Sequence, residues 1–172
     1  MRVRDHIALS TAGAAALAPW AGRRALGAWA ASILIDIDHY LGFSVHERQV
    51  SPRRAVRFFN QPDAPHHPAT RVLHHPTTLL AVALLGTRRR AALPVALGMA
   101  FHVALDVQHE RRLRDMRTSA MRRDDFTCQA CGVPGRPVTS HVWRQPRLLP
   151  SYRMQDVVTL CTSCHEAAHA NA

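Results

Sequence analysis

The stretches RRDDFTCQACG (residues 122–132) and DVVTLCTSCHEAAH (residues 156–169) decide how the C-terminal third of this chain folds. They contain all four cysteines of the protein, as two Cys-x-x-Cys pairs: Cys128, Cys131, Cys161 and Cys164. Two such pairs suit a metal site better than a disulfide framework, and they indicate a reducing compartment. Four thiolates form a closed tetrahedral site, so the sequence predicts a structural zinc ion. Metal binding would compensate for the small core of a module of about 50 residues.

Three histidines accompany the cysteines. His165 and His169 are four residues apart, so on a helix they project from one face and can share a metal ion. His141 lies between the cysteine pairs, where a β-hairpin would bring it opposite that helix. A neutral imidazole beside a divalent cation can take a proton from water, while the cation stabilises charge on a phosphate. Taken singly, each histidine reads as a surface or zinc-shell residue; taken together in this order, they favour a nuclease.

With these residues, the chain resembles the HNH endonuclease family over residues 122–169. The resemblance implies a ββα-metal fold, zinc on the four cysteines and one catalytic divalent ion such as Mg²⁺, Mn²⁺, Ni²⁺ or Zn²⁺. It implies that His141 is the general base, that His165 and His169 face the catalytic metal, and that Asp156 takes the place of the family's asparagine. The implied activity is hydrolysis of phosphodiester bonds in DNA. The sequence departs from the family in Ser140, where a metal-binding aspartate or histidine is usual, and in Asp156 itself.

A basic segment precedes this module. The formal net charge is +10, and all 22 basic residues are arginine. A basic surface attracts nucleic acid and anionic lipid headgroups alike. We expect residues 108–121 to form a basic linker helix and residues 122–172 to form the nuclease module. Phosphate contacts are expected from the arginines in and just after this linker, namely Arg111, Arg112, Arg114, Arg117, Arg122 and Arg123. The alternative is a merely solvated connector.

Residues 1–107 have the composition of a separate helical domain. Four alanine- and leucine-rich segments are long enough for helices: Ile7–Trp20, Ala25–Ile37, Leu73–Leu85 and Ala91–Leu105. Short arginine-containing turns separate the first two and the last two, which predicts two antiparallel hairpins and hence a four-helix bundle. Residues 40–72 show no clear period and are expected to form a long loop. The fold class is therefore predicted as mainly α, with the small zinc-bound ββα module at the C-terminus.

Metal-ligand residues recur at the ends of these helices. With antiparallel hairpins they fall at one end of the bundle, where nitrogen and carboxylate ligands would suit zinc, manganese or iron. Asp36 and Asp38 would close the second helix, where the helix dipole opposes them and a nearby positive charge is needed. We expect Asp38, His74 and His102 to share one coordination sphere. The alternative is ordinary polar decoration of helix ends. The full set is His6, Asp36, Asp38, His39, His74, His102 and Asp106.

The same residues resemble a second family, the predicted membrane-bound metal-dependent hydrolases, over residues 4–107. The shared pattern is His…Asp-x-Asp-His…His-x-x-Thr…His-x-x-x-Asp. The resemblance implies a second metal site, within the helices, and association with a membrane. The Gly-x-Thr-His usual before the third helix is replaced here by LHHPT (residues 73–77).

Three functions follow as hypotheses. The first is an HNH nuclease with a helical metal-binding domain; the second is a catalytically inactive, zinc-stabilised nucleic-acid-binding module. The third is a membrane-surface hydrolase that acts through the helices. The apolar segments run about 13–15 residues, short of the roughly 20 that span a bilayer. Because the N-terminus also lacks a clean signal peptide, we expect a cytoplasmic protein with at most peripheral membrane contact. The expected partner is DNA, and the sequence does not specify an oligomeric state.

Overall fold

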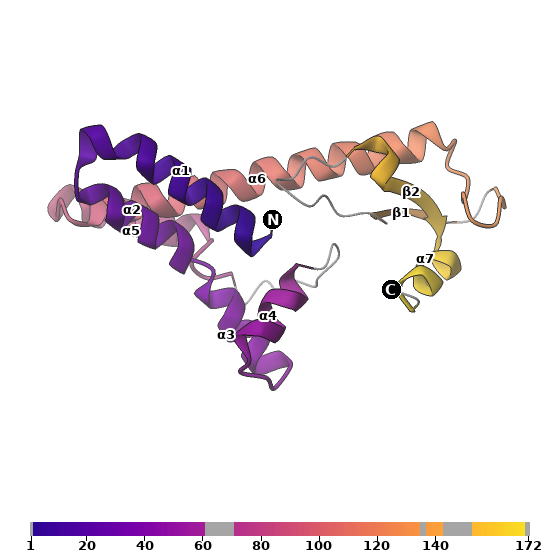
Figure 1. The fold of residues 1–172 in the computed structure, drawn as a ribbon, viewed down its shortest axis with the longest axis horizontal. Helices are drawn as coiled ribbons and strands as arrows, with labels where there is room; N and C mark the ends of the chain where they lie inside the picture. The colour runs from indigo at the N-terminus through magenta and orange to yellow at the C-terminus, as the bar shows by residue number, and fades with distance from the viewer. Residues whose placement is uncertain (1, 61–70, 135–136, 143–152, 171–172) are drawn as a thin grey trace. The chain divides into compact units, whose positions relative to one another are not determined.

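The computed structural model describes residues 2–60, 71–134, 137–142 and 153–170. It divides the chain into two compact units, Met1–Val107 and Gln108–Ala172. The described residues are mainly helical and include a two-stranded sheet, so the predicted mainly α fold class is confirmed (Figure 1). Helix α6 (Ala92–Arg123) contributes its residues 92–107 to the first unit and its residues 108–123 to the second.

Helices occur where the N-terminal sequence predicted them. They are α1 (Val3–Ala21), α2 (Arg24–Leu34), α5 (Pro76–Arg88) and the first half of α6. Helices α1 and α2 pack side by side (Figure 1). Gly22 ends α1 with a φ of +54°, a conformation that glycine adopts without steric cost. Its backbone N–H donates to the carbonyl of Ala18, which closes the helix end.

The expected loop over residues 40–72 is wrong in its first half. Helix α3 (Ile37–His46) and helix α4 (Pro52–Phe59) occupy that segment, and they pack against each other. Pro52 stands at the first position of α4, where its fixed φ favours helix and its missing N–H costs nothing. Phe58 then packs against Phe43 of α3, with ring centroids 5.3 Å apart. Residues 61–70 of the expected loop lie outside the described residues. A bundle of four helices alone therefore does not describe this unit.

These two helices also change the local setting of the acidic residues. Asp36 lies in the break between α2 and α3, and Asp38 lies in the first turn of α3. The expectation that these residues close a helix is therefore wrong for Asp38, which lies at the start of α3, whereas Asp36 follows the end of α2. The helix dipole favours a carboxylate in the first turn of α3 instead of opposing it.

Helices α2 and α6 approach each other at Gly98. A Cβ atom at this position would lie 2.0 Å from the carbonyl oxygen of Ala28. Only glycine fits here, and the resulting backbone contact lets the side chains one turn further along α6 reach α2. His102 is one of those side chains.

Residues 108–121 are helical as expected, but they are not a linker helix of their own, because α6 continues without a break to Arg123. Residues 99–123 contain no glycine or proline to interrupt it. In the C-terminal unit, Leu113, Met116 and Ala120 recur at helical spacing and pack on Val142 and Val157. The end of α6 is thus a core element of this unit.

The C-terminal unit contains one antiparallel strand pair followed by a helix. Strand β1 (Val138–Val142) pairs with β2 (Val157–Cys161), with His141 opposite Val158. The short 3-10 helix η2 (Met154–Asp156) precedes β2, and α7 (Thr162–Ala170) follows it directly. Residues 135–136 and 143–152 lie outside the description. Among the described helices, none combines the length and apolar character needed to cross a bilayer.

Candidate functional site

The four cysteines form one cluster in the C-terminal unit. Cys128 and Cys131 lie in the turn after α6, Cys161 ends β2, and Cys164 lies in the first turn of α7. Their sulfur atoms all lie within 4.8 Å of one another. The Sγ atoms of Cys131 and Cys161 are 3.9 Å apart. Thiolates bound about 2.3 Å from a tetrahedral zinc ion would be about 3.8 Å apart. The cluster could therefore hold a metal ion such as zinc.

Backbone contacts give this cluster its shape. Gly132 has a φ of +68°, and its N–H donates to the carbonyl of Cys128 at 2.8 Å. A residue with a Cβ adopts this φ only at a cost, so the glycine allows the tight turn. The N–H of Gln129 donates to the carbonyl of Thr159 at 2.9 Å, which holds the first cysteine pair beside β2.

The thiols of the cluster influence one another's protonation. A hydrogen bond with Ser163 Oγ, assisted by the backbone N–H of Cys164, lowers the pKa of Cys161 to about 6. Hydrogen bonding to Cys161 and Cys128 raises the pKa of Cys164 to about 12. The protonation of Cys161 and Cys164 is thus coupled, and a divalent cation bound by the cluster would displace thiol protons.

The three C-terminal histidines form a second cluster. One ligand nitrogen of each of His141, His165 and His169 lies within 4.8 Å of the other two. The Nε2 atoms of His165 and His169 are 3.3 Å apart, which matches the roughly 3.3–3.4 Å between imidazole ligands on one tetrahedral zinc ion. His141 is buried, whereas His169 is exposed, so the cluster opens to solvent on its α7 side. Strand β1 and helix α7 together make a site with the donor set for a divalent transition metal.

The two residues that depart from the family pattern do not join this cluster. Successive residues of a strand point to opposite faces, so Ser140 faces away from the side on which His141 lies. Asp156 is buried, and its Oδ2 accepts a hydrogen bond from the N–H of Arg153 at 2.8 Å. Among the described residues, Asp156 belongs to no group of potential metal ligands. Its observed role is to cap η2, immediately before β2 begins.

The basic residues of α6 divide into two kinds. The first kind can reach solvent: Arg117 is half-buried, and four others are exposed, namely Arg111, Arg112, Arg114 and Arg122.

Arg123 is the second kind, because its side chain bonds within the unit. Its guanidinium binds the carboxylate of Asp124 and the carbonyls of Met154 and Val157. These bonds connect the end of α6 to the start of β2, so the Arg123 side chain has a structural role.

The helical unit brings together the histidines and aspartates that the sequence singled out. The Oδ1 atom of Asp36 lies 3.4 Å from Nε2 of His74 and 3.3 Å from Nε2 of His102. The two Nε2 atoms are 3.3 Å apart. Oδ2 of Asp106 lies 3.4 Å from Nε2 of His102. These spacings again equal those of ligands on one tetrahedral ion, about 3.3–3.4 Å. Asp36, His74 and His102 therefore have the spacing of ligands that share one metal ion, and so do His74, His102 and Asp106.

Outer hydrogen bonds orient the two histidines at the centre of this site. Nδ1 of His102 lies 2.7 Å from the carbonyl oxygen of Ser32, which can only accept, so Nδ1 carries the proton. Nδ1 of His74 lies 3.2 Å from Oδ2 of Asp38. Both rings thereby point Nε2 toward each other. Each Nε2 then carries a lone pair, and two lone pairs at this distance need a cation or a shared proton between them. Carboxylate or carbonyl groups behind ligand histidines are the usual outer contacts of metal sites.

The expectation that Asp38, His74 and His102 share one coordination sphere is therefore wrong for Asp38. Asp38 accepts hydrogen bonds from Nδ1 of His74 and from the N–H of Leu73, so it lies behind His74. His6 and His39 lie beside the carboxylates of the same cluster: Nε2 of His6 is 3.0 Å from Oδ1 of Asp106, and Nε2 of His39 is 3.9 Å from Oδ1 of Asp36. Sequence reasoning missed Ser32, because a backbone carbonyl 70 residues from its partner leaves no signal in the side-chain pattern.

The pKa values of the histidines and aspartates in this cluster depend strongly on one another. Burial opposes the charged form of His102, but hydrogen bonds to Asp106 and Asp36 outweigh burial and raise the pKa of His102 to about 9. Burial would raise the pKa of Asp36, yet hydrogen bonds with His102 and His74 hold that pKa well below its usual range. The pKa of Asp106 is lowered in the same way, against burial, by His102 and His6. The carboxylates thus require positive charge, which protons on histidine or a divalent metal ion can supply.

A comparison of this chain with family models, with curated proteins and with solved structures finds no match.

Proposed function

We propose that the C-terminal unit is an HNH-type endonuclease module that hydrolyses phosphodiester bonds in DNA. The observation that carries this proposal is the pairing of two different metal-type clusters around one strand pair and one helix. Four cysteines form a closed site, and three histidines form an open one. Closed cysteine sites are structural, whereas sites with an open position suit catalysis.

In this proposal, the histidines have two roles: two of them bind the metal ion and the third acts as the base. A divalent ion on His165 and His169 would stabilise negative charge on the phosphate and on the leaving 3′-oxygen. His141 takes a proton from the attacking water, whose oxygen forms the new bond to phosphorus. The bond from phosphorus to the 3′-oxygen breaks, and that oxygen takes a proton from solvent. The buried ring of His141 lies against both helix histidines, with centroids 5.1 and 4.8 Å away, so the proposed base is adjacent to the proposed metal ligands.

A plasmid-nicking assay tests the proposal. The purified full chain is stripped of metal, reloaded with Zn²⁺, and then supplied with Mg²⁺, Mn²⁺ or Ni²⁺. Nicking that requires the second metal supports the nuclease. DNA binding without nicking under every metal would leave the zinc-stabilised binding module as the function of this unit.

A second function is favoured for the helical unit by a separate observation, the facing Nε2 atoms of His74 and His102. We propose that Asp36, His74, His102 and Asp106 hold a divalent metal ion for a hydrolytic reaction. Two nitrogen and two oxygen ligands suit zinc or manganese. Metal analysis of the full chain tests this: His102→Ala should lower the bound zinc by one ion per chain. Unchanged zinc would remove this function and leave the nuclease proposal intact.

A further inference from the structure

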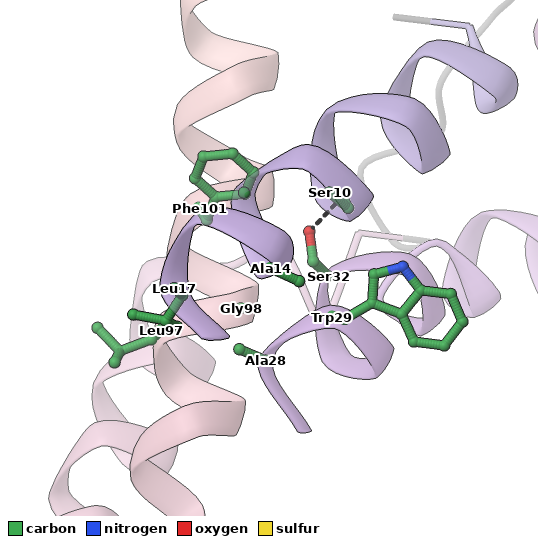
Figure 2. Close-up of a pocket in the computed structure, with 10 residues that line it drawn as sticks. Ser10, Ala14, Leu17, Ala28, Trp29, Ser32, Leu97, Gly98 and Phe101 are labelled. Carbon is green, nitrogen blue, oxygen red and sulfur yellow. Dashed lines mark hydrogen bonds between the residues drawn. The ribbon is translucent and has the colours of Figure 1, made fainter. Parts of the chain in front are cut away.

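An apolar pocket lies in the helical unit between α1, α2 and α6 (Figure 2). Its volume is about 280 Å³, at the small end of the roughly 300–1,000 Å³ of ligand pockets. Small residues make room for it, among them Gly13 and Ala14 of α1 and Ala28 of α2. Trp29 and Phe101 line it with large apolar surfaces.

The pocket offers almost no hydrogen bonding to a ligand. Its polar lining residues are Ser10 and Ser32, which are buried and have their Oγ atoms 2.8 Å apart. Figure 2 shows the hydrogen bond between them. Two hydroxyls that satisfy each other leave a surface suited to hydrocarbon, and a polar ligand would lose its bonds to water on entering. The matching occupant is an aliphatic chain.

The pocket adjoins the metal-type cluster on all three helices. On α1, Ser10 lies one turn after His6; on α6, Gly98 lies one turn before His102. One helical turn is about 5.4 Å, so the two features are immediate neighbours. Ser32 joins them directly, because its side chain lines the pocket while its carbonyl accepts the Nδ1–H of His102. One ligand could therefore reach both.

We propose that the helical unit acts on an amphiphile whose polar, hydrolysable group binds at the histidine–aspartate cluster and whose aliphatic chain fills this pocket. The inference rests on the hydrolytic function proposed above for the same unit. It assigns the substrate class: an acyl ester or amide, or an alkyl phosphoester, with a single chain. The volume allows one chain and excludes a second.

Alkyl hydroxamates test both halves of such a ligand, because the hydroxamate head chelates a metal ion and the chain is varied separately. Binding of acetyl, butanoyl, hexanoyl, octanoyl and decanoyl hydroxamate is measured by calorimetry on the zinc-loaded full chain. The chain carries His165→Ala, so that the C-terminal histidine cluster does not contribute. We expect affinity to rise by up to about fourfold for each methylene buried, and to stop rising once the pocket is full.

A matched pair of variants locates the aliphatic chain. Ala14→Phe fills the pocket and should abolish the chain-length dependence while acetohydroxamate binds as before. Ala16→Phe adds the same ring to an exposed position of α1 and should leave the dependence unchanged. Affinity that does not change with chain length, or a dependence that survives Ala14→Phe, would overturn the pocket assignment. Loss of acetohydroxamate binding in Ala14→Phe as well as in His102→Ala would also contradict the pocket assignment. A phenylalanine that fills the pocket should not affect binding of the hydroxamate group. Acetohydroxamate affinity unaffected by His102→Ala would instead refute the metal function itself.

Discussion

The carboxylate of Asp124 accepts a hydrogen bond from the backbone N–H of Thr159 at 3.2 Å, and so links the end of α6 to the middle of β2. Arg123 reinforces this link, because its guanidinium binds Asp124 at 2.7 and 2.9 Å and the carbonyl of Val157 at 3.0 Å. The strand that ends in Cys161 is thereby attached to the helix that precedes Cys128.

Breaking this link should loosen the C-terminal unit. Asp124→Asn removes the charged acceptor and should cost about 1–3 kcal/mol of stability, as expected for a charge-assisted hydrogen bond left unmade. Hydrogen exchange at the Thr159 amide should speed up accordingly. Asp125→Asn is the control, since Asp125 has a φ of +47°, which asparagine tolerates. Equal exchange rates in the two variants would contradict the assigned role of Asp124.

The effect of Asp124 should depend on pH. Its hydrogen bonds to Arg123 hold the pKa of Asp124 below its usual value. A carboxyl group with a lowered folded-state pKa stabilises the protein above its unfolded pKa, which is about 3.9. That contribution is lost as pH falls through the folded-state pKa. The stability difference between the wild type and Asp124→Asn should therefore be full above about pH 5 and shrink below about pH 4. Denaturation of both proteins across this range measures it, and a constant difference would exclude the ion pair as its source.

Zinc content should depend on each cysteine of the cluster. Cys161→Ser should abolish tight zinc binding at the cysteine cluster and unfold the C-terminal unit, because metal binding supplies on the order of 10 kcal/mol to such small modules. Ser163→Ala changes a neighbour 3.3 Å from the Cys161 sulfur that is not one of the four thiols, and should keep the zinc. Metal analysis after purification under reducing conditions checks both. Disulfides among the four cysteines would contradict the zinc interpretation.

His141 should be needed for cleavage more than for binding. Replacing it by alanine should slow DNA nicking by ~10²–10⁴-fold, the usual loss on removing a general base, with DNA affinity nearly unchanged. Thr139→Ala, on the exposed part of the same strand, should nick normally. Retained metal at the histidine cluster in His141→Ala would support the role of base. Loss of that metal would make His141 a ligand, and unchanged nicking would remove it from the mechanism.

The exposed arginines of α6 should contribute affinity without sequence preference. Replacing Arg111, Arg112 and Arg114 by glutamine should weaken binding to all duplexes equally. The slope of log K against log salt should flatten by up to about 0.9 for each phosphate that the variant no longer neutralises. The control replaces the exposed residues 88–90, all arginine, which removes the same charge from the helical unit. If both triple variants change the slope equally, net charge rather than this surface of α6 governs binding.

The hydrogen bond behind His74 should tune metal affinity. Asp38→Asn should weaken metal binding in the helical unit by about 10–100-fold, the range found for outer contacts of ligand histidines. His75→Ala, at the neighbouring residue outside the cluster, should have no such effect. Competition with a chelator measures the affinity. Identical affinities in Asp38→Asn and the wild type would show that Asp38 does not orient His74.

Elements with local signals could be predicted from the amino-acid sequence. The spacing of Cys128, Cys131, Cys161 and Cys164 was enough to predict one cluster, because two Cys-x-x-Cys turns have few other uses for their thiols. The alanine- and leucine-rich segments predicted α1, α2, α5 and the start of α6, because helix propensity sums over a long window. The i,i+4 spacing of His165 and His169 predicted their shared face, because the period of a helix is constant.

Contacts between residues far apart in the chain became apparent from the folded structure. It separated Asp36, which faces the Nε2 atoms, from Asp38, which lies behind His74, although both are acidic residues of one Asp-x-Asp pair. It assigned Arg123 to the fold rather than to the exposed arginines, because the carbonyls of Met154 and Val157 lie within reach only after folding. It revealed the Ser32 carbonyl behind His102, which depends on the close approach of α2 and α6 at Gly98. Backbone groups are the same at every residue, so the partners they find are set by packing and not by local sequence.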